Sequence, residues 1–148
     1  MRMIPFPISI MCLAMVLCSF SGDHGDAITG IWFNQEKTSK IKIVKMNEKY
    51  FGKIVWLKVT HDVKTGKPRT DIENPDESRR NEPLMNLTVL RRLKWDKGVD
   101  YSDGLIYDPK NGKEYSCKAH LKDKNHMELR GYIGISLLGR TAVWERAE

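Results

Sequence analysis

The sequence has few cysteines and no long apolar run. It contains three cysteines in 148 residues, and two of them, Cys12 and Cys18, lie within the apolar N-terminal run from about Ile8 to Phe20. That run is shorter than the roughly 20 apolar residues that a membrane-spanning helix needs. Only Cys117 lies beyond it, which excludes an internal disulfide in the rest of the chain. A retained helical anchor is therefore the weaker interpretation of the N-terminus.

Signatures of catalysis are also missing. The chain has no Gly-x-Ser-x-Gly, so the nucleophile elbow of the hydrolases is excluded. Cys117 and His120 are three residues apart on an expected strand, where such positions face opposite ways. The four histidines show no spacing typical of metal ligands. The sequence therefore predicts a protein that is not an enzyme, with no catalytic residues, no metal and no cofactor.

The N-terminus has the pattern of a secretory signal peptide. A positive start, Met1-Arg2, precedes the apolar run, and small residues at Ser19 and Ser21 stand before Gly22. We predict a signal peptide over residues 1–21 and a single domain over residues 22–148, exported to the periplasm or secreted. A lipid on Cys18 is disfavoured, because the three residues before it are bulky.

The chain is mildly basic, with a formal net charge of +6. A net positive charge is compatible with binding to nucleic acid, anionic lipid or acidic partners, but the predicted export argues against nucleic acid. Most of the positive side chains are spread along expected strands. The tighter cluster of Arg91, Arg92 and Lys94 is the best candidate for a surface that meets an anionic lipid head group.

Period-two alternation recurs along the chain between turn signals. Residues 40–46 and 50–57 form an expected hairpin around Asn47-Glu48, with Tyr50 and Trp56 on one face. The segment 114–122 alternates most cleanly and places Tyr115 and Cys117 on its apolar face. Residues 22–28 are expected to form a flexible lead.

Two segments depart from this pattern. Residues 58–83 form a long loop that predicts a flap or a short helix. Residues 133–138 are too apolar for a surface loop and are expected to be buried. The remaining segments, with 140–146 as a closing strand, give about eight antiparallel strands. We predict an all-β, eight-stranded antiparallel barrel with one long loop, since closure removes exposed edges; a two-sheet sandwich is the alternative.

Gly30-Ile31-Trp32 opens the first expected strand and resembles the start of lipocalin-like (calycin-type) barrels. In such barrels the tryptophan plugs the closed end, and an arginine from the last strand stacks on its ring. Arg140 and Arg146 are both candidates for that arginine. A plain core tryptophan is an equally good interpretation of Trp32.

Motifs along nearly the whole expected domain resemble the bacterial family called domain of unknown function 2147. They are, in order, Tyr50-Phe51-Gly52-Lys53-Ile54-Val55-Trp56-Leu57, Asp71-x-x-Asn74-Pro75-Asp76, Gly104-Leu105-Ile106-Tyr107-Asp108-Pro109-x-Asn111-Gly112-Lys113-x-Tyr115-x-Cys117, Arg130-Gly131-Tyr132-x-Gly134 and Leu138-Gly139-Arg140-x-x-x-Trp144. The resemblance implies an exported lipocalin-like barrel that binds a small molecule in the envelope. Where the family usually has Gly-Leu, this chain has Asn86-Leu87.

Two functions remain open at this point. The first is binding of a small apolar or amphipathic molecule inside the barrel, with Tyr50, Trp56, Arg91 and Tyr115 as candidate ligand-binding residues. The second is a non-enzymatic protein–protein interaction module of the envelope, whose barrel is filled by its own side chains. The oligomeric state is left open by both.

Overall fold

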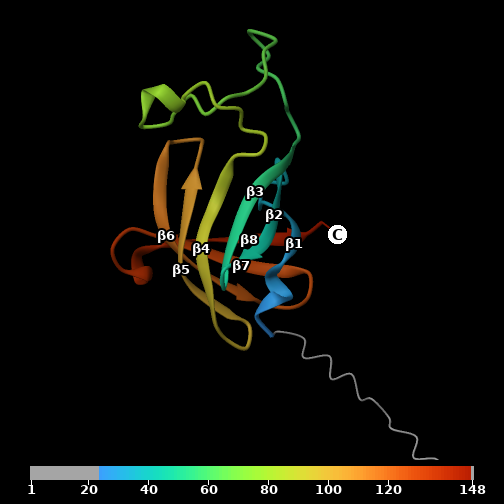
Figure 1. Cartoon of the computed structure of the whole chain (residues 1–148), viewed down its shortest axis with the longest axis vertical. Helices are drawn as coiled ribbons and strands as arrows, with labels where there is room; N and C mark the ends of the chain where they lie inside the picture. The colour runs from blue at the N-terminus through green and yellow to red at the C-terminus, as the bar shows by residue number, and fades with distance from the viewer. Residues whose placement is uncertain (1–23, 148) are drawn as a thin grey trace, which may run out of the picture.

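Eight antiparallel strands close into a barrel in the computed structural model, which describes residues 24–147 (Figure 1). Each strand pairs with the next, and β1 pairs with β8. The predicted fold class is confirmed; the predicted signal peptide, residues 1–21, lies outside the described residues. The strands are β1 (Gly30–Phe33), β2 (Ser39–Met46), β3 (Lys49–Leu57), β4 (Thr88–Lys97), β5 (Asp100–Asp108), β6 (Lys113–Leu121), β7 (His126–Tyr132) and β8 (Arg140–Arg146).

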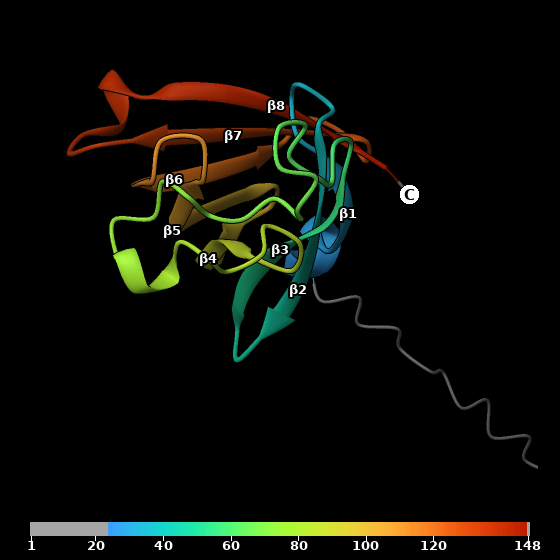
Figure 2. The same ribbon diagram turned by 90° about the horizontal axis from the view of Figure 1, so that it is seen from above.

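The two ends of the barrel differ in what connects the strands. At one end, the closed end, lie the short turns β2–β3, β4–β5 and β6–β7 and the 3₁₀ helix η1 (His24–Ile28). At the other, the open end, lie the β1–β2, β3–β4, β5–β6 and β7–β8 connections, of which residues 58–87 form the largest (Figures 1 and 2). Within residues 24–147, no helix is long and apolar enough to cross a membrane.

Trp32 and Arg146 occupy the closed end together. Trp32 is fully buried, and its Nε1 donates to the carbonyl of Ile28 at 2.9 Å. The Arg146 guanidinium carbon lies 4.2 Å from the centroid of the Trp32 ring, within cation–π range. The same guanidinium donates to the carbonyls of Ala27 and Thr29 at 2.7 and 2.9 Å. It therefore ties the ring to the segment that leads into β1.

The prediction of a flexible lead over residues 22–28 is wrong for its described part, residues 24–28. They form η1, which is held against the barrel by two tyrosines. Tyr101 donates to the carbonyl of Gly25 at 2.6 Å, and Tyr50 donates to Asp26 at 3.0 Å. Burial and the neighbouring Asp26 carboxylate raise the pKa of Tyr50 well above its usual range. The buried phenols need hydrogen-bond partners, and η1 supplies them.

The prediction that Tyr50 and Trp56 share one inward face is wrong, and a β-bulge is the reason. The register of β3 against β2 shifts between Ile54 and Trp56, so that Val55 is an extra residue. The alternation therefore changes phase: Ile54 and Leu57 are buried, while Trp56 is 38% exposed on the outer face. There it contacts Phe33 edge-on, with ring centroids 6.0 Å apart.

Residues 133–138, expected to be buried, form an exposed loop that contains the 3₁₀ helix η3 (Ser136–Leu138). Four aliphatic side chains of this loop are among the most exposed large hydrophobic side chains of the described residues. Apolar composition favoured burial, but the neighbouring strands β7 and β8 already pair with each other directly. The loop therefore projects beyond the barrel wall (Figures 1 and 2).

The long connection between β3 and β4 contains the 3₁₀ helix η2 (Glu77–Arg79), as the sequence allowed, and is anchored to the barrel by Asp71. Asp71 is fully buried, and its carboxylate accepts from Tyr107 at 2.8 Å and from Asn74 at 2.7 Å. Burial and the hydrogen bond to Asp71 raise the pKa of Tyr107 to about 12. Gly112 lies against the same segment, where an added Cβ would meet the carbonyl oxygen of Glu73. The Asp-x-x-Asn motif is thus a structural clamp.

Cys117 points inward with Ala119 and Leu121, as predicted, and is fully buried. Burial raises the pKa of its thiol to about 12. Since the thiolate is the reactive form, we expect iodoacetamide at about pH 8 to alkylate the folded protein at least about 100-fold more slowly than the urea-unfolded chain. Mass spectrometry of timed samples measures both rates. Equal rates would place Cys117 on the solvated face.

Candidate functional site

A cavity of about 590 Å³ opens at the open end of the barrel. The interior toward the closed end is filled by fully buried side chains that include Trp32, Tyr50, Tyr101 and Met127. The barrel is therefore filled at its closed end and hollow at its open end. The volume lies within the range of about 300–1,000 Å³ typical of small-molecule sites.

The deep wall of the cavity is apolar. Its side chains come from five strands and from the end of the long connection, and most of them are buried. They belong to inward-facing positions on either side of the barrel, so that an apolar chain would be surrounded. This wall consists of Ile41, Ile54, Leu57, Leu84, Val89, Leu129, Ala142 and Trp144.

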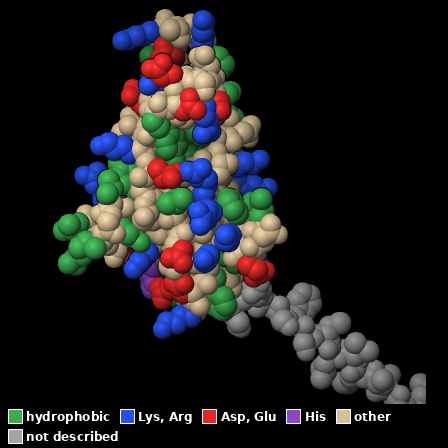
Figure 3. All heavy atoms as spheres, turned by 60° about the vertical axis from the view of Figure 1, so that its left-hand side comes forward, with side chains coloured by type: hydrophobic (Ala, Val, Ile, Leu, Met, Phe, Trp, Pro, Cys, Tyr) green, Lys and Arg blue, Asp and Glu red, His purple; other side chains and the backbone are tan. Residues whose placement is uncertain are grey.

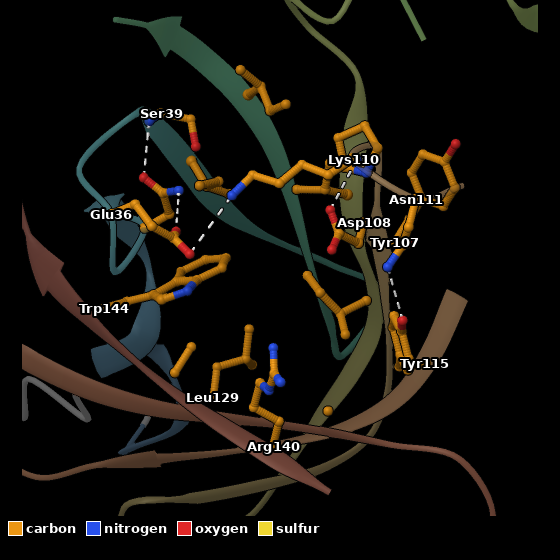
Figure 4. A pocket seen from close by; sticks show the side chains of 18 of the residues that line it. Glu36, Ser39, Tyr107, Asp108, Lys110, Asn111, Tyr115, Leu129, Arg140 and Trp144 are labelled. Atoms are coloured by element: carbon orange, nitrogen blue, oxygen red, sulfur yellow. Dashed lines mark hydrogen bonds and ion pairs between the residues drawn. The ribbon is translucent and has the colours of Figure 1, made fainter. Parts of the chain in front are cut away.

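The rim is polar, and an ion pair crosses part of it. Lys110, in the β5–β6 turn, lies 3.6 Å from Glu36, in the β1–β2 loop (Figure 4). Asn34 shapes the β1–β2 loop: its side-chain oxygen accepts from the backbone N–H groups of Thr38 and Ser39 at 2.8 and 2.9 Å. Both members of the ion pair are more than half exposed, so it contributes at most about 1 kcal/mol. A ligand could displace it at little cost.

Arg140 enters the cavity from the opposite wall. It stands on β8 across from Gly131 on β7, and alternates with Ala142 and Trp144 on the inward face. Figure 4 shows Arg140, Leu129 and Trp144 directed into the same space. An arginine at this level offers up to five N–H donors to a carboxylate or a phosphate.

The structure brings together only some of the residues predicted for ligand binding. Tyr115 lines the cavity, and its hydroxyl accepts from Asn111 at 3.0 Å. Tyr50 belongs to the closed end, and Trp56 lies on the outer face. Arg91 is also exposed and pairs with Glu114. For Arg91 the reason is again a bulge: the register of β4 against β3 shifts between Thr88 and Leu90, so that Val89 and Leu90 are both buried and Arg91 faces outward.

The two arginines proposed for barrel closure lie at opposite ends of the barrel. Arg146 stacks on Trp32 at the closed end, whereas Arg140, six residues earlier on β8, lines the cavity at the open end. The structure thus assigns one candidate to each end of the barrel.

Several cavity residues were missed from the sequence. Trp144 and Gly131 belong to the quoted family motifs, and the alternation of Arg140, Ala142 and Trp144 could have placed these three on one face. Glu36 and Lys110 lie in loops and gave no such signal. Within the described part of the chain there is no group of three or more His, Cys, Asp or Glu side chains placed to hold a metal ion.

Comparison with known families gives one match over residues 30–146, to the family described as "Uncharacterized protein conserved in bacteria (DUF2147)". The chain belongs to this family. The match spans all eight strands of the DUF2147 barrel described above, and the suspected resemblance is confirmed. No curated protein matches the chain.

A solved structure with a similar fold is described as "Protein HP1028 from the human pathogen Helicobacter pylori belongs to the lipocalin family". It aligns with a TM-score of 0.69 and 23% sequence identity, over 81% of this chain and 82% of that chain. At this identity the likeness shows the fold alone. The DUF2147 protein therefore has a lipocalin-like barrel, as predicted.

Proposed function

We propose that this DUF2147 protein binds a small amphipathic molecule with an anionic head group in the cavity at the open end. The observation that carries the proposal is the polarity of the cavity, which is apolar at depth and has Arg140 at its rim. An alkyl chain would lie against Ile41, Leu129 and Trp144. A carboxylate or phosphate would then face the Arg140 guanidinium.

The energetics of such a complex are reasonable. Each buried methylene contributes about 0.8 kcal/mol, so eight of them contribute about 6 kcal/mol before the costs of association. A charge-assisted hydrogen bond adds roughly 1.5–3 kcal/mol. The sum of roughly 8 kcal/mol is the gross interaction energy from which the costs of association are subtracted, so we expect saturable binding that is weaker than micromolar. No covalent step is part of the proposal, which is for a binding protein and not an enzyme.

A fluorescent polyene fatty acid and its methyl ester test this proposal. We expect saturable binding of the acid by the wild-type protein, because the chain enters the cavity. Arg140→Gln should weaken binding of the acid by about tenfold, since a charge-assisted bond is lost, and should leave the ester within about twofold. Absence of saturable binding for both probes would overturn the proposal, and equal effects on both would remove the anionic head group from it.

The alternative of an interaction module assumed a barrel filled by its own side chains. The cavity of about 590 Å³ at the open end argues against that assumption. Ligand binding is therefore the function we propose.

We also propose that the protein is exported after removal of residues 1–21, on the signal pattern of the sequence. Mass analysis of the mature protein from an envelope fraction should give Gly22 as the first residue. An intact Met1, or a lipid on Cys18, would contradict cleavage at this position.

A further inference from the structure

We propose that the loop between β7 and β8 docks the protein on the surface of an anionic phospholipid bilayer. Residues 133–138 of this loop are called the docking tip below. Its four large side chains are exposed to unusual degrees for aliphatic residues: Ile133 by 70%, Ile135 by 60%, Leu137 by 82% and Leu138 by 79%. Figure 3 shows hydrophobic side chains projecting from one flank of the molecule. Grouped exposed apolar side chains of this kind mark an interaction surface.

The backbone of the docking tip is prepared for an apolar environment. Arg130, on β7, donates to the carbonyl of Ser136 at 2.6 Å and to that of Leu137 at 3.0 Å. The backbone N–H groups of Leu138 and of the next residue, Gly139, donate to the carbonyls of Ile135 and Ser136 in the tip. Unpaired polar backbone groups are costly to bury in lipid. The arginine brace lowers that cost and fixes the tip with its apolar side chains outward.

The charge around the docking tip suits an anionic surface. From Leu129 to Trp144 the sequence contains no aspartate or glutamate, but it contains Arg130 and Arg140. Arg140, at the base of the tip, is exposed. Basic residues next to inserted apolar side chains strengthen binding to anionic lipids.

The shape of the docking tip favours a bilayer over a protein partner. The tip is a projecting loop of aliphatic residues, whereas the dominant residues of protein interfaces are more often tryptophan, tyrosine and arginine in pockets. Ile133 and Leu138 also line the mouth of the cavity, so the tip and the cavity share one apolar surface. If the proposed function holds, an amphipathic ligand could pass between bilayer and cavity along this surface; docking itself does not depend on it.

Vesicle flotation of the purified protein tests the docking. We expect the wild type to float with vesicles of phosphatidylglycerol and phosphatidylethanolamine, and far less with vesicles of phosphatidylcholine. Ile135→Asp combined with Leu137→Asp should lower the partition by at least about tenfold, because both charges would enter the apolar layer. Neither residue lines the cavity, so fatty-acid binding in solution should be unchanged.

The matched control places the same charges on another exposed loop. Val59 and Val63, in the β3–β4 connection, are 49% and 95% exposed. Val59→Asp combined with Val63→Asp should float as the wild type does. Leu137→Trp adds a direct reading of insertion, since its emission should shift to the blue with anionic vesicles, while that of Val63→Trp should not.

Three results would overturn the docking proposal. The wild type would fail to float, or the tip variant would float as well as the control. Alternatively, the wild type would form a dimer in solution that the tip variant abolishes, with no binding to vesicles, and the tip would then be an interface between two copies of this chain.

Discussion

Trp32→Ala should destabilise the protein by about 3–5 kcal/mol, the usual range for removing a large buried aromatic side chain. The indole is fully buried and carries the Arg146 guanidinium 4.2 Å above its ring. Its loss opens a void at the closed end and leaves the carbonyl of Ile28 without its donor. Since small domains have unfolding free energies of about 5–15 kcal/mol, the variant loses a large part of its stability. Urea unfolding followed by circular dichroism measures the change.

Two arginine variants on β8, the strand that closes the barrel, test whether stability depends on the Trp32 contact or on any substitution in this strand. Arg146→Ala should also be clearly destabilising, because it removes the cation–π contact and the donors to Ala27, Thr29 and Lys124. Arg140→Ala, on the same strand, should cost less than about 0.5 kcal/mol, as is usual for exposed positions. A loss under about 1 kcal/mol for Trp32→Ala would contradict the plug.

Local chemistry made several features of the fold predictable. The Asn47-Glu48 turn takes positive φ at both residues, 50° and 61°, as the hairpin signal required. Cys117 is buried because the alternation of β6 is unbroken from Tyr115 to Leu121. The Gly-x-Trp start and the closing strand correctly suggested the Trp32 contact, although the choice between Arg140 and Arg146 needed the strand register.

Two of the wrong predictions share one physical source: an alternating pattern in the sequence does not show where a β-bulge inserts an extra residue. The bulges at Val55 in β3 and between Thr88 and Leu90 in β4 each change the phase of a strand. That change moved Trp56 and Arg91 away from the interior, although their sequence neighbourhoods favoured it. Residues 133–138 failed differently: apolar content predicts burial only where another element is available to cover it.

Asn86 adopts a backbone conformation that is more usual for glycine. The residue has φ 70°, in the left-handed region that glycine adopts freely. Asparagine is among the residues that tolerate this region best. The backbone N–H of Asn86 donates to the carbonyl of Ile54. The N–H of Ile54 donates in turn to the carbonyl of Leu87. The chain therefore bends into β4 here without a glycine.

The cavity itself could not be predicted from the sequence, because it depends on which inward positions leave space. Gly131 is one of them: a Cβ added there would meet Ile106 and Tyr115 at 3.5 and 3.6 Å, which are ordinary contacts. Gly131→Phe should therefore place its ring in the cavity without disturbing the barrel. We expect affinity for the polyene fatty acid to fall by about 100-fold or more, because the ring occupies the volume that the alkyl chain needs.

Val143→Phe is the matched control for Gly131→Phe. Val143 stands on the adjacent strand β8, opposite Glu128, and is 38% exposed on the outer face. The same aromatic group placed there adds bulk outside the barrel, so affinity should stay within about twofold of the wild type. Unfolding in urea should show that both variants remain folded, and the ring of Gly131→Phe should stabilise the barrel slightly by filling its void. Wild-type affinity in a folded Gly131→Phe would move the ligand out of the cavity, and a loss in both variants would show that the effect is not one of cavity volume.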